Sequence, residues 1–408
     1  MSRKVVQINV CANCLSTGRI TEGIGLQAQA NGFESYVAYG RFAKPSQNKL
    51  LQIGSRKDYL MHGFFSRIFD DHGLHSKAAT RNLIQQMDKI QPDIVHLHNI
   101  HGFFLNYPLL FDYLRVKRIP AVWTLHDCWP FTGHCAYFDY VKCGRWLSGC
   151  HDCPQKKTYP ASYVFDRSRQ NWLDKKQCFT SLDNMTIVPV SHWLGDLVKQ
   201  SFLGKYPVQV IYNGIDTDVF KPADPDIARD KYGWGNDKIL LGVASTWSPR
   251  KGLGDFLALS KILPAGYRIV LVGLSAKQQQ GLPENVTGIS RTESVQELAE
   301  LYSAADVFIN PTWEDNYPTT NLEAMACGTP VITYRTGGSP ESLSADTGMV
   351  VEKGDIAGLK EAVLCMPKNT DACRQRALNY FRQEDRFREY VDLYNGLLQG
   401  RDLRGKKV

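Results

Sequence analysis

The sequence predicts an α/β fold of two doubly wound, Rossmann-like domains that face a cleft between them. At 408 residues the chain is too long for one ordinary hydrophobic core. Short runs rich in Val and Ile alternate with helix-like spacing, a pattern that builds parallel sheets covered by helices. The alternation then starts again in the second half of the chain, which indicates a second sheet. Ligands of such sheets bind beyond the carboxyl ends of the strands.

The first half contains five strand-like runs bounded by Gly, Pro, Asn or Asp. They are residues 4–10, 34–40, 93–99, 121–127 and 186–191. Residues 20–31 and 77–90 have the apolar spacing of helices. We therefore expect an N-terminal domain over residues 1–206.

The second half repeats this pattern. Its expected strands are residues 208–213, 239–245, 268–273, 306–312 and 330–335, and its expected helices are residues 252–263, 295–304, 320–327 and 356–365. These elements predict a second domain over residues 207–380. A helical stretch over residues 371–399 has one apolar face. We expect its end, residues 381–408, to pack back on the N-terminal domain.

Composition excludes several classes of protein. The chain is 43% hydrophobic and 22% charged, and none of its apolar runs approaches the ~20 residues of a membrane span. The N-terminus resembles a first strand more than a signal peptide, so we expect a cytoplasmic protein. The net charge of +7 is mild and the sequence contains no nucleic-acid-binding signature. We therefore expect no nucleic-acid partner.

Three glycine-containing turns follow expected strands and precede expected helices, where backbone N–H groups can bind phosphate. They are residues 14–20, 245–252 and 336–342. The residues that they offer to a phosphate are Thr17, Gly18, Gly337 and Gly338, together with the cations Arg250 and Lys251. A tight turn that needs glycine is the alternative at each position.

The segment "WEDNYPTTNLEAMACGTPV" places the carboxylates Glu314, Asp315 and Glu323 around the start of one helix. Acids at a helix start can simply cap it. For Glu323, which lies inside the helix among apolar neighbours, capping is a weak explanation, because an unpaired buried carboxylate is costly. A ligand with hydroxyl groups would supply partners for these acids.

Five segments carry a resemblance to a known family: "VSHWLGDLV", "VIYNGIDTDVFKP", "STWSPRKGLGDFL", "LYSAADVFINPTWEDNYPTTNLEAMACGTPVI" and "TGGSPE". Together they resemble the retaining nucleotide-sugar glycosyltransferases of family 4, which have the GT-B fold. The resemblance covers nearly the whole chain, and it is closest to the branch that builds bacterial exopolysaccharides such as colanic acid.

The resemblance implies a hexosyltransferase-type enzyme that moves a sugar from a nucleotide-diphosphate donor with retention of configuration. It also implies that the N-terminal domain binds the acceptor and that the C-terminal domain, residues 207–380, binds the nucleotide sugar. The implied acceptor is a lipid-linked oligosaccharide in bacterial exopolysaccharide or lipopolysaccharide synthesis, and no cofactor is implied for catalysis. Two alternatives stay open at this point. One is a nucleotide-sugar epimerase of the same fold, and the other is an inactive subunit that binds a nucleotide sugar.

The resemblance also implies roles for the acids and cations. In the family, a Glu faces the donor sugar and a second Glu, after seven intervening residues, binds the ribose. Glu323 matches the second acid, while Asp315 by register or Glu314 by residue type takes the sugar-facing place. Lys251 matches the diphosphate-binding lysine, but Thr246 replaces the expected arginine, so Arg250 is the candidate for a second cation.

His126 ends the strand-like run "AVWTLHD", where the family places a histidine close to the donor sugar and the acceptor. Resemblance and position make His126 a candidate catalytic residue, next to a second candidate, Asp127. A structural histidine at a strand end and a capping aspartate are the alternatives. Four further histidines lie nearby in the sequence: His96, His98, His101 and His134.

A cysteine-rich insertion near residues 128–153 resembles one found in the exopolysaccharide branch. Cys135, Cys143, Cys150 and Cys153 could enclose a structural Zn²⁺, and thiols packed as small apolar groups are the alternative. Residues 155–177 follow, with basic and aromatic side chains interleaved. They could rest on the inner face of an anionic membrane, or they could form an ordinary solvated helix.

Overall fold

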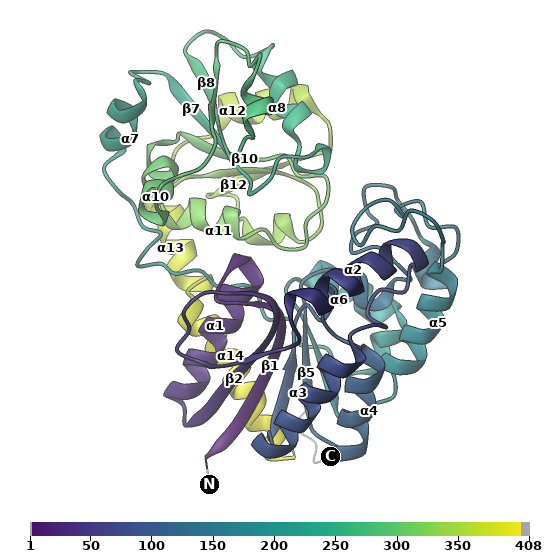
Figure 1. Cartoon of the computed structure of the whole chain (residues 1–408). Coiled ribbons are helices and arrows are strands. Elements are labelled where there is room, and N and C mark those ends of the chain that lie inside the picture. The colour runs from purple at the N-terminus through teal and green to yellow at the C-terminus, as the bar shows by residue number, and fades with distance from the viewer. Residues whose placement is uncertain (1, 401–408) are drawn as a thin grey trace. The chain divides into compact units, whose positions relative to one another are not determined.

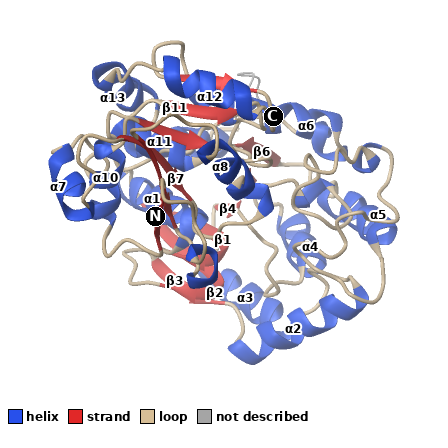
Figure 2. Cartoon of the chain, turned by 90° about the horizontal axis from the view of Figure 1, so that it is seen from above, coloured by secondary structure: helices blue, strands red, loops and turns tan. Residues whose placement is uncertain are grey.

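The computed structural model describes residues 2–400, which divide into two compact units (Figure 1). The first unit runs to Tyr212 and takes up the chain again from Glu384, and the second spans Asn213–Gln383. In each unit helices flank a parallel sheet (Figure 2). Among the residues described, none of the helices combines the length and apolar character needed to span a bilayer.

The first unit contains a six-stranded parallel sheet in the order β3-β2-β1-β4-β5-β6. Its strands are β1 (Arg3–Ala12), β2 (Phe33–Ala43), β3 (Lys49–Gln52), β4 (Ile94–Leu97), β5 (Ala121–Leu125) and β6 (Met185–Pro189). Five of them overlap the predicted strands. The short edge strand β3 was not predicted, because it has too few residues for a recognisable alternation.

The helices of the first unit pack on both faces of this sheet. They are α1 (Leu15–Ala30), α2 (Arg56–Phe69), α3 (Lys77–Ile90), α4 (Tyr107–Lys117), α5 (Ser168–Phe179) and α6 (His192–Gln200), with short 3-10 turns at Trp129–Phe131, Arg145–Leu147 and Phe202–Lys205. Helix α3 has the bounds that its apolar spacing predicts.

Helix α14 (Gln383–Leu398) completes the core of the first unit. Its residues Phe387, Tyr390 and Tyr394 are buried in one cluster with Ile24 of α1 and Phe33 of β2. In Figure 1 this C-terminal helix lies beside α1, the first helix of the chain. The first unit is therefore assembled from both ends of the chain.

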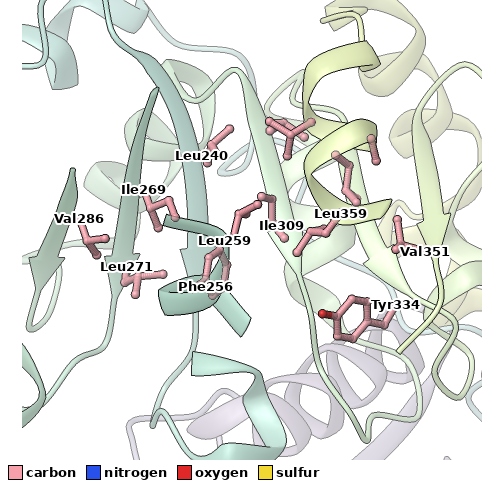
Figure 3. Packing of buried hydrophobic residues seen from close by; sticks show 14 of the residues in the cluster. Leu240, Phe256, Leu259, Ile269, Leu271, Val286, Ile309, Tyr334, Val351 and Leu359 are labelled. Carbon is pink, nitrogen blue, oxygen red and sulfur yellow. The ribbon is translucent and has the colours of Figure 1, made fainter. Parts of the chain in front are cut away.

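The second unit contains another parallel sheet, in the order β12-β11-β10-β7-β8-β9. Its strands are β7 (Lys238–Val243), β8 (Tyr267–Val272), β9 (Val286–Ile289), β10 (Val307–Asn310), β11 (Val331–Tyr334) and β12 (Gly348–Val351). Figure 3 shows Leu240, Ile269 and Ile309 from the sheet packed with Leu259 of α8 and Leu359 of α12. All five of these side chains are buried.

The helices of the second unit follow the predicted alternation. They are α7 (Pro225–Tyr232), α8 (Leu253–Ser260), α9 (Ala276–Gln279), α10 (Val295–Ala304), α11 (Thr319–Ala326), α12 (Ile356–Cys365) and α13 (Thr370–Tyr380), with 3-10 turns at Pro249–Lys251 and Ser339–Ser342. The expected single helical stretch over 371–399 is divided into α13 and α14. The break occurs because Phe381 and Gln383 exchange backbone hydrogen bonds with Ile215.

The expectation that residues 208–213 begin the second sheet is wrong. The segment bonds to β6 of the first sheet: Gln209 N donates to the Ile187 carbonyl and Ile211 N to the Pro189 carbonyl. Only an isolated bridge, between Ile187 and Val208, forms there. The first unit therefore ends at Tyr212, a few residues after the boundary that the sequence predicts.

Candidate functional site

The second unit brings several predicted site residues together where β7, β10 and β11 end. Lys251 lies in the turn between β7 and α8, and Asp315 lies in the loop between β10 and α11. The Lys251 Nζ atom is 2.6 Å from Asp315 Oδ2, and both side chains are partly exposed. A cation and a carboxylate from segments far apart in the sequence thus form one ion pair at the carboxyl edge of the sheet.

Arg250 holds the loop that carries the carboxylates. Its Nη1 donates to the Glu314 carbonyl at 2.7 Å, and its own carbonyl accepts a hydrogen bond from the Trp313 amide at 2.8 Å. These contacts give Arg250 a structural task on the 313–315 backbone. The same contacts place it next to Lys251 and Asp315, so its charge adds to the positive potential at this edge.

The glycine turn after β11 closes against the same loop. Gly337 has a left-handed φ of +51°, and a Cβ atom there would lie 1.8 Å from the Asp315 carbonyl oxygen. The Gly338 amide donates to the Asn316 carbonyl at 3.0 Å. Beside them the buried Thr336 hydroxyl has no hydrogen-bond partner among the described residues. The predicted turn and the predicted carboxylate loop therefore pack directly against each other.

The two candidate sugar-facing acids differ in their surroundings. Glu314 is buried at 4% exposure, whereas Asp315 is partly exposed. The Asp315 carboxylate already meets a cation, Lys251, that the family resemblance assigns to the diphosphate. Which of the two acids faces the sugar stays a prediction.

Glu323 lies on α11, and its Oε2 accepts a hydrogen bond from the Tyr302 hydroxyl at 3.1 Å. The side chain of Tyr302 is fully buried, and burial together with this carboxylate raises the pKa of its hydroxyl. Glu323 itself is partly exposed. The apolar neighbours of Glu323 in the sequence predict a buried carboxylate without a protein partner. The structure corrects both points, so its ribose-binding role depends on the family resemblance alone.

In the first unit, His126 directly follows β5 and belongs to a chain of hydrogen bonds. Gln7 Nε2 donates to the Thr21 carbonyl at 3.0 Å, so Gln7 Oε1 faces His98 Nε2 as an acceptor at 3.1 Å. The His98 Nδ1 atom meets His126 Nε2 at 3.3 Å. Because a neutral His98 carries its proton on Nε2, His126 donates from Nε2 and keeps Nδ1 as an acceptor.

The imidazole rings of His98 and His126 are both neutral near pH 7. Burial lowers the pKa of His98 well below its ordinary value, and burial lowers the pKa of His126 to about 4 although Asp127 opposes this. His126 is therefore a hydrogen-bonding group there and not a cation. The sequence analysis noted His98 only as a neighbour. The pattern "HLHN", which places two histidines on one face of a strand end, is the signal that could have identified it.

Asp127 pairs with a second histidine that the sequence analysis left without a role. His101 Nε2 is 2.8 Å from Asp127 Oδ2, and His101 Nδ1 is 2.8 Å from the Tyr159 hydroxyl. The Trp129 amide donates to Asp127 Oδ1 at 2.9 Å. Burial alone would raise the pKa of Asp127, but His101 and the Trp129 amide lower it by more. The pKa therefore lies below its ordinary value, and the carboxylate is ionised. His98, His101, His126 and Asp127 line one small cavity.

Thr17 and Gly18 lie in the first turn of α1, in the first unit. The Thr17 hydroxyl accepts a hydrogen bond from Asn9 Nδ2 at 3.4 Å. A Cβ atom at Gly18 would lie 2.9 Å from Cys11 Sγ, so the glycine serves the packing of α1 on β1. Their phosphate-binding role stays a prediction.

The structure does not support the predicted zinc site. Within residues 2–400, no group of three or more His, Cys, Asp or Glu side chains is arranged so that it could hold a metal ion. Cys135, Cys143, Cys150 and Cys153 are free thiols that line one small cavity. Cys150 Sγ accepts the Gly133 amide at 3.1 Å, and a hydrogen bond with Cys135 lowers the pKa of Cys153 to about 7. The thiols thus bond to the backbone and to each other, as packed thiols do.

Lys175 of α5 fixes the segment that follows Asp127, and it was not predicted. Its Nζ donates to the Trp129 carbonyl at 2.8 Å and to the Thr132 carbonyl at 3.0 Å, and it lies 3.6 Å from the centre of the Trp129 ring. The side chain is buried at 2% exposure. Burial lowers the pKa of its ammonium to about 7.

We expect Lys175→Met to lower the free energy of unfolding, and by more at pH 9 than at pH 6.5. Between about pH 7 and its ordinary value of 10.5 the unfolded lysine binds a proton that the folded one does not. Folding of the wild type is therefore favoured as pH rises, by at most about 1.4 kcal/mol per pH unit. Urea denaturation across this range measures the effect. Lys176→Met, at an exposed position of the same helix, is the control, and an equal loss at every pH would contradict the assignment.

Comparison with known proteins relates this chain to glycosyltransferases. Residues 18–219 match the family model described as Glycosyltransferase Family 4, and residues 237–369 match the model described as Glycosyl transferases group 1. A protein of Escherichia coli K12 named as a colanic acid biosynthesis glycosyl transferase, WcaC, is 28% identical over 324 residues, which are 75% of this chain and 77% of that protein. The N-acetyl-alpha-D-glucosaminyl L-malate synthase of Bacillus anthracis is 26% identical over 54% of this chain and 61% of its own length.

Solved structures agree on the fold. Sucrose-phosphate synthase from Thermosynechococcus elongatus has a TM-score of 0.68 at 16% identity, over 97% of this chain and 99% of that one. Anabaena Alr3699/HepE, solved in complex with UDP, has a TM-score of 0.67 at 13% identity, over 97% and 100% of the two chains. None of these four proteins is named as an epimerase or a binding subunit, so those two alternatives are not favoured.

Proposed function

Because this chain has the GT-B fold and carries a family 4 and a group 1 glycosyltransferase domain, it is a glycosyltransferase, and we propose that it transfers one sugar from a nucleotide-diphosphate donor with retention of configuration. The observation that carries the proposal is the cluster of Lys251, Asp315 and the Gly337–Gly338 turn at the carboxyl edge of the second sheet. This edge is where doubly wound sheets bind their ligands.

The donor is proposed to bind the second unit. Lys251 would contact the diphosphate, and the nearby positive charge of Arg250 would add to the attraction. Glu323 would accept hydrogen bonds from the ribose hydroxyls. In support, Alr3699/HepE of the same fold was solved with UDP and with UDP-glucose. When the donor binds, its diphosphate would replace Asp315 as the partner of Lys251, and the freed carboxylate would face the sugar.

Catalysis in this proposal is electrostatic. The bond between the anomeric carbon and the diphosphate oxygen breaks, and a bond to the acceptor hydroxyl oxygen forms on the same face of the sugar. The proton of that hydroxyl passes to the leaving diphosphate. Lys251 and nearby N–H groups stabilise the charge that develops on the leaving diphosphate. Neutral His126, with its Nδ1 atom as an acceptor, would hold a hydroxyl group of the sugar or the acceptor. No cofactor enters the proposed reaction.

The acceptor is proposed to be a lipid-linked oligosaccharide of bacterial surface polysaccharide synthesis, bound by the first unit. The relative named for colanic acid biosynthesis supports this choice, since it covers three quarters of the chain. Such an acceptor lies at the inner face of the membrane, so we propose that the protein works there as a peripheral enzyme.

A panel of nucleotide sugars incubated with a membrane lipid extract tests the proposal. Sugar should be transferred from one donor only when acceptor is present, and proton NMR of the product should show the anomeric configuration of the donor. Inversion at the anomeric carbon would refute retention. Release of free sugar as the sole reaction, or no consumption of any donor, would refute the transfer itself.

Asp315→Asn is expected to lower turnover by about 100-fold or more, because a charge placed against the reacting sugar would be lost. Glu314→Gln should have a smaller effect, since Glu314 is buried at 4% exposure. Steady-state kinetics with saturating donor compares the two variants directly. Normal turnover in Asp315→Asn together with an inactive Glu314→Gln would exchange the two roles.

A further inference from the structure

Helix α2 exposes large apolar residues on a face where an ordinary surface helix carries polar ones. The residues that it buries are polar or small: His62 is 1% exposed, Ser66 is 3% exposed, and Gly63 lies between them. The residues that it exposes are large and apolar, with Leu60 at 54% and Phe64 at 57% exposure. A capping box between Ser55 and Asp58 fixes the start of the helix.

The neighbouring helix α3 shows the normal arrangement. It buries Leu83 and Met87 and exposes Lys77, Arg81 and Lys89. Exposed apolar residues scattered singly on a surface need no explanation, but a row along one helix face indicates an interaction site. The contrast shows that α2 is not simply a poorly packed helix in a loosely formed region.

A second segment extends the apolar surface of α2. The amide of Tyr163 donates to the Arg67 carbonyl at 2.8 Å, and the amide of Phe165 donates to the Ile68 carbonyl at 3.1 Å. The Phe165 ring stacks on Phe69 with centroids 5.9 Å apart. Residues 163–165 thus run beside the end of α2, and all three are more than half exposed.

We call the exposed apolar side chains of these two segments the α2 surface. Its members are Leu60, Met61, Phe64, Phe69, Tyr163, Val164 and Phe165. In Figure 2, α2 lies at the outer edge of the first unit. Of the aromatic residues that the sequence interleaves with basic ones over residues 155–177, Tyr163 and Phe165 are exposed, whereas Trp172 is 7% exposed and packs inside the unit.

Basic side chains surround the α2 surface. Arg56 and Lys57 are exposed in the first turn of α2, Arg67 in its last, and Lys157 and Arg169 on the segment that continues past it. The nearby acid Asp58 is used in the capping box, and Asp166 accepts backbone hydrogen bonds from Cys153 and Ser168. The apolar surface is therefore edged mainly by positive charge.

We propose that the α2 surface docks on an anionic lipid bilayer. An amphipathic helix with an apolar face and basic flanks lies in the plane of a membrane interface, and each Lys or Arg near such a surface adds attraction to anionic lipids. The biological role of this docking rests on the proposed function, because a first unit docked on the bilayer would meet a lipid-linked acceptor where that acceptor is anchored. The surface itself is independent of the chemistry at Lys251 and Asp315.

Flotation of the full chain with lipid vesicles tests the docking. The protein should bind phosphatidylcholine vesicles that contain phosphatidylglycerol, bind much less to phosphatidylcholine alone, and detach at high salt. Leu60→Gln/Phe64→Gln should lower the affinity at least about tenfold, since two apolar side chains would no longer enter the bilayer. Val116→Gln, which changes a residue of α4 that is 63% exposed, is the matched control and should bind like the wild type.

Three results would overturn the proposal. They are no binding to anionic vesicles, equal binding by the double variant, or a dimer in light scattering that the double variant abolishes while vesicles bind neither protein. Unchanged thermal melting verifies that the variant is folded. Transfer to a water-soluble acceptor should be the same in the wild type and the double variant. If even the wild type transfers nothing, the proposed function fails while the vesicle result still stands.

Discussion

Replacing Lys251 with methionine is expected to weaken binding of the nucleotide-sugar donor by about 10- to 150-fold. A hydrogen bond to a charged group contributes about 1.5–3 kcal/mol, and every 1.4 kcal/mol is a tenfold change in affinity. Lys251 is the cation that the second unit presents beside Asp315, with its Nζ 2.6 Å from the carboxylate. Methionine keeps most of the length of the side chain and removes the ammonium group, with both its charge and its hydrogen-bond donors. Titration calorimetry with the donor identified by the transfer panel measures the loss.

Two further variants separate this effect from a general disturbance. Lys277→Met removes a charge from an exposed position of the same unit and should leave donor affinity unchanged. If the diphosphate replaces Asp315 as the partner of Lys251, then Asp315→Asn should not weaken binding of the free nucleoside diphosphate, because a competing carboxylate charge is removed. An unchanged affinity in Lys251→Met would place the diphosphate elsewhere.

Gly337→Ala is expected to lower the free energy of unfolding by about 2–5 kcal/mol and to abolish most transfer activity. An L-residue in the left-handed region costs about 1–2 kcal/mol, and forcing an extra carbon into a packed position adds about 1–3 kcal/mol. The new Cβ atom would lie 1.8 Å from the Asp315 carbonyl oxygen, which is backbone and has no rotamer to change. The loop that carries the candidate sugar-facing acid would have to move.

The matched control for this variant is Gly233→Ala. Gly233 also has a left-handed φ, of +66°, but an added Cβ atom would meet nothing within 4 Å. It should therefore lose only the conformational part, about 1–2 kcal/mol, and keep its activity. Equal losses of stability and activity in the two variants would show that the contact with the Asp315 loop is unimportant. Denaturant unfolding and the transfer assay measure both quantities.

Periodicity in the sequence predicted the elements that bury one regular face. The bounds of α3, α10 and α12 follow from their apolar spacing, and most strands follow from continuous runs of Val and Ile, because parallel strands are buried on both faces. The failures occurred where tertiary contacts override local pattern. The segment at 208–213 has the composition of a strand, but its backbone bonds to β6 at one edge of the first sheet.

The sequence could predict those parts of the candidate site that depend on the type and position of single residues. Lys251, Asp315 and Gly337 were named from the sequence, and the structure brings them into contact. What could not be predicted is pairing across the sheet. The bond between His98 and His126 depends on the order of β4 and β5, and the burial of Lys175 depends on how α5 packs. Neither the His98–His126 hydrogen bond nor the burial of Lys175 can be recognised from the pattern of residues within one segment of the sequence.

The placement of α14 has a consequence for the order of events on the ribosome. The tyrosines of this helix close the core of the first unit, where the hydroxyl of Tyr394 meets the ring of His96 at 2.6 Å and that of Tyr390 meets Thr124 at 3.3 Å. Until the last stretch of chain has been synthesised, Ile24, Phe33 and these buried polar groups have no cover. The unit that is translated first therefore reaches its native state last, after the whole second unit has left the exit tunnel. An incomplete chain would expose an apolar groove, which makes it a substrate for chaperones and proteases.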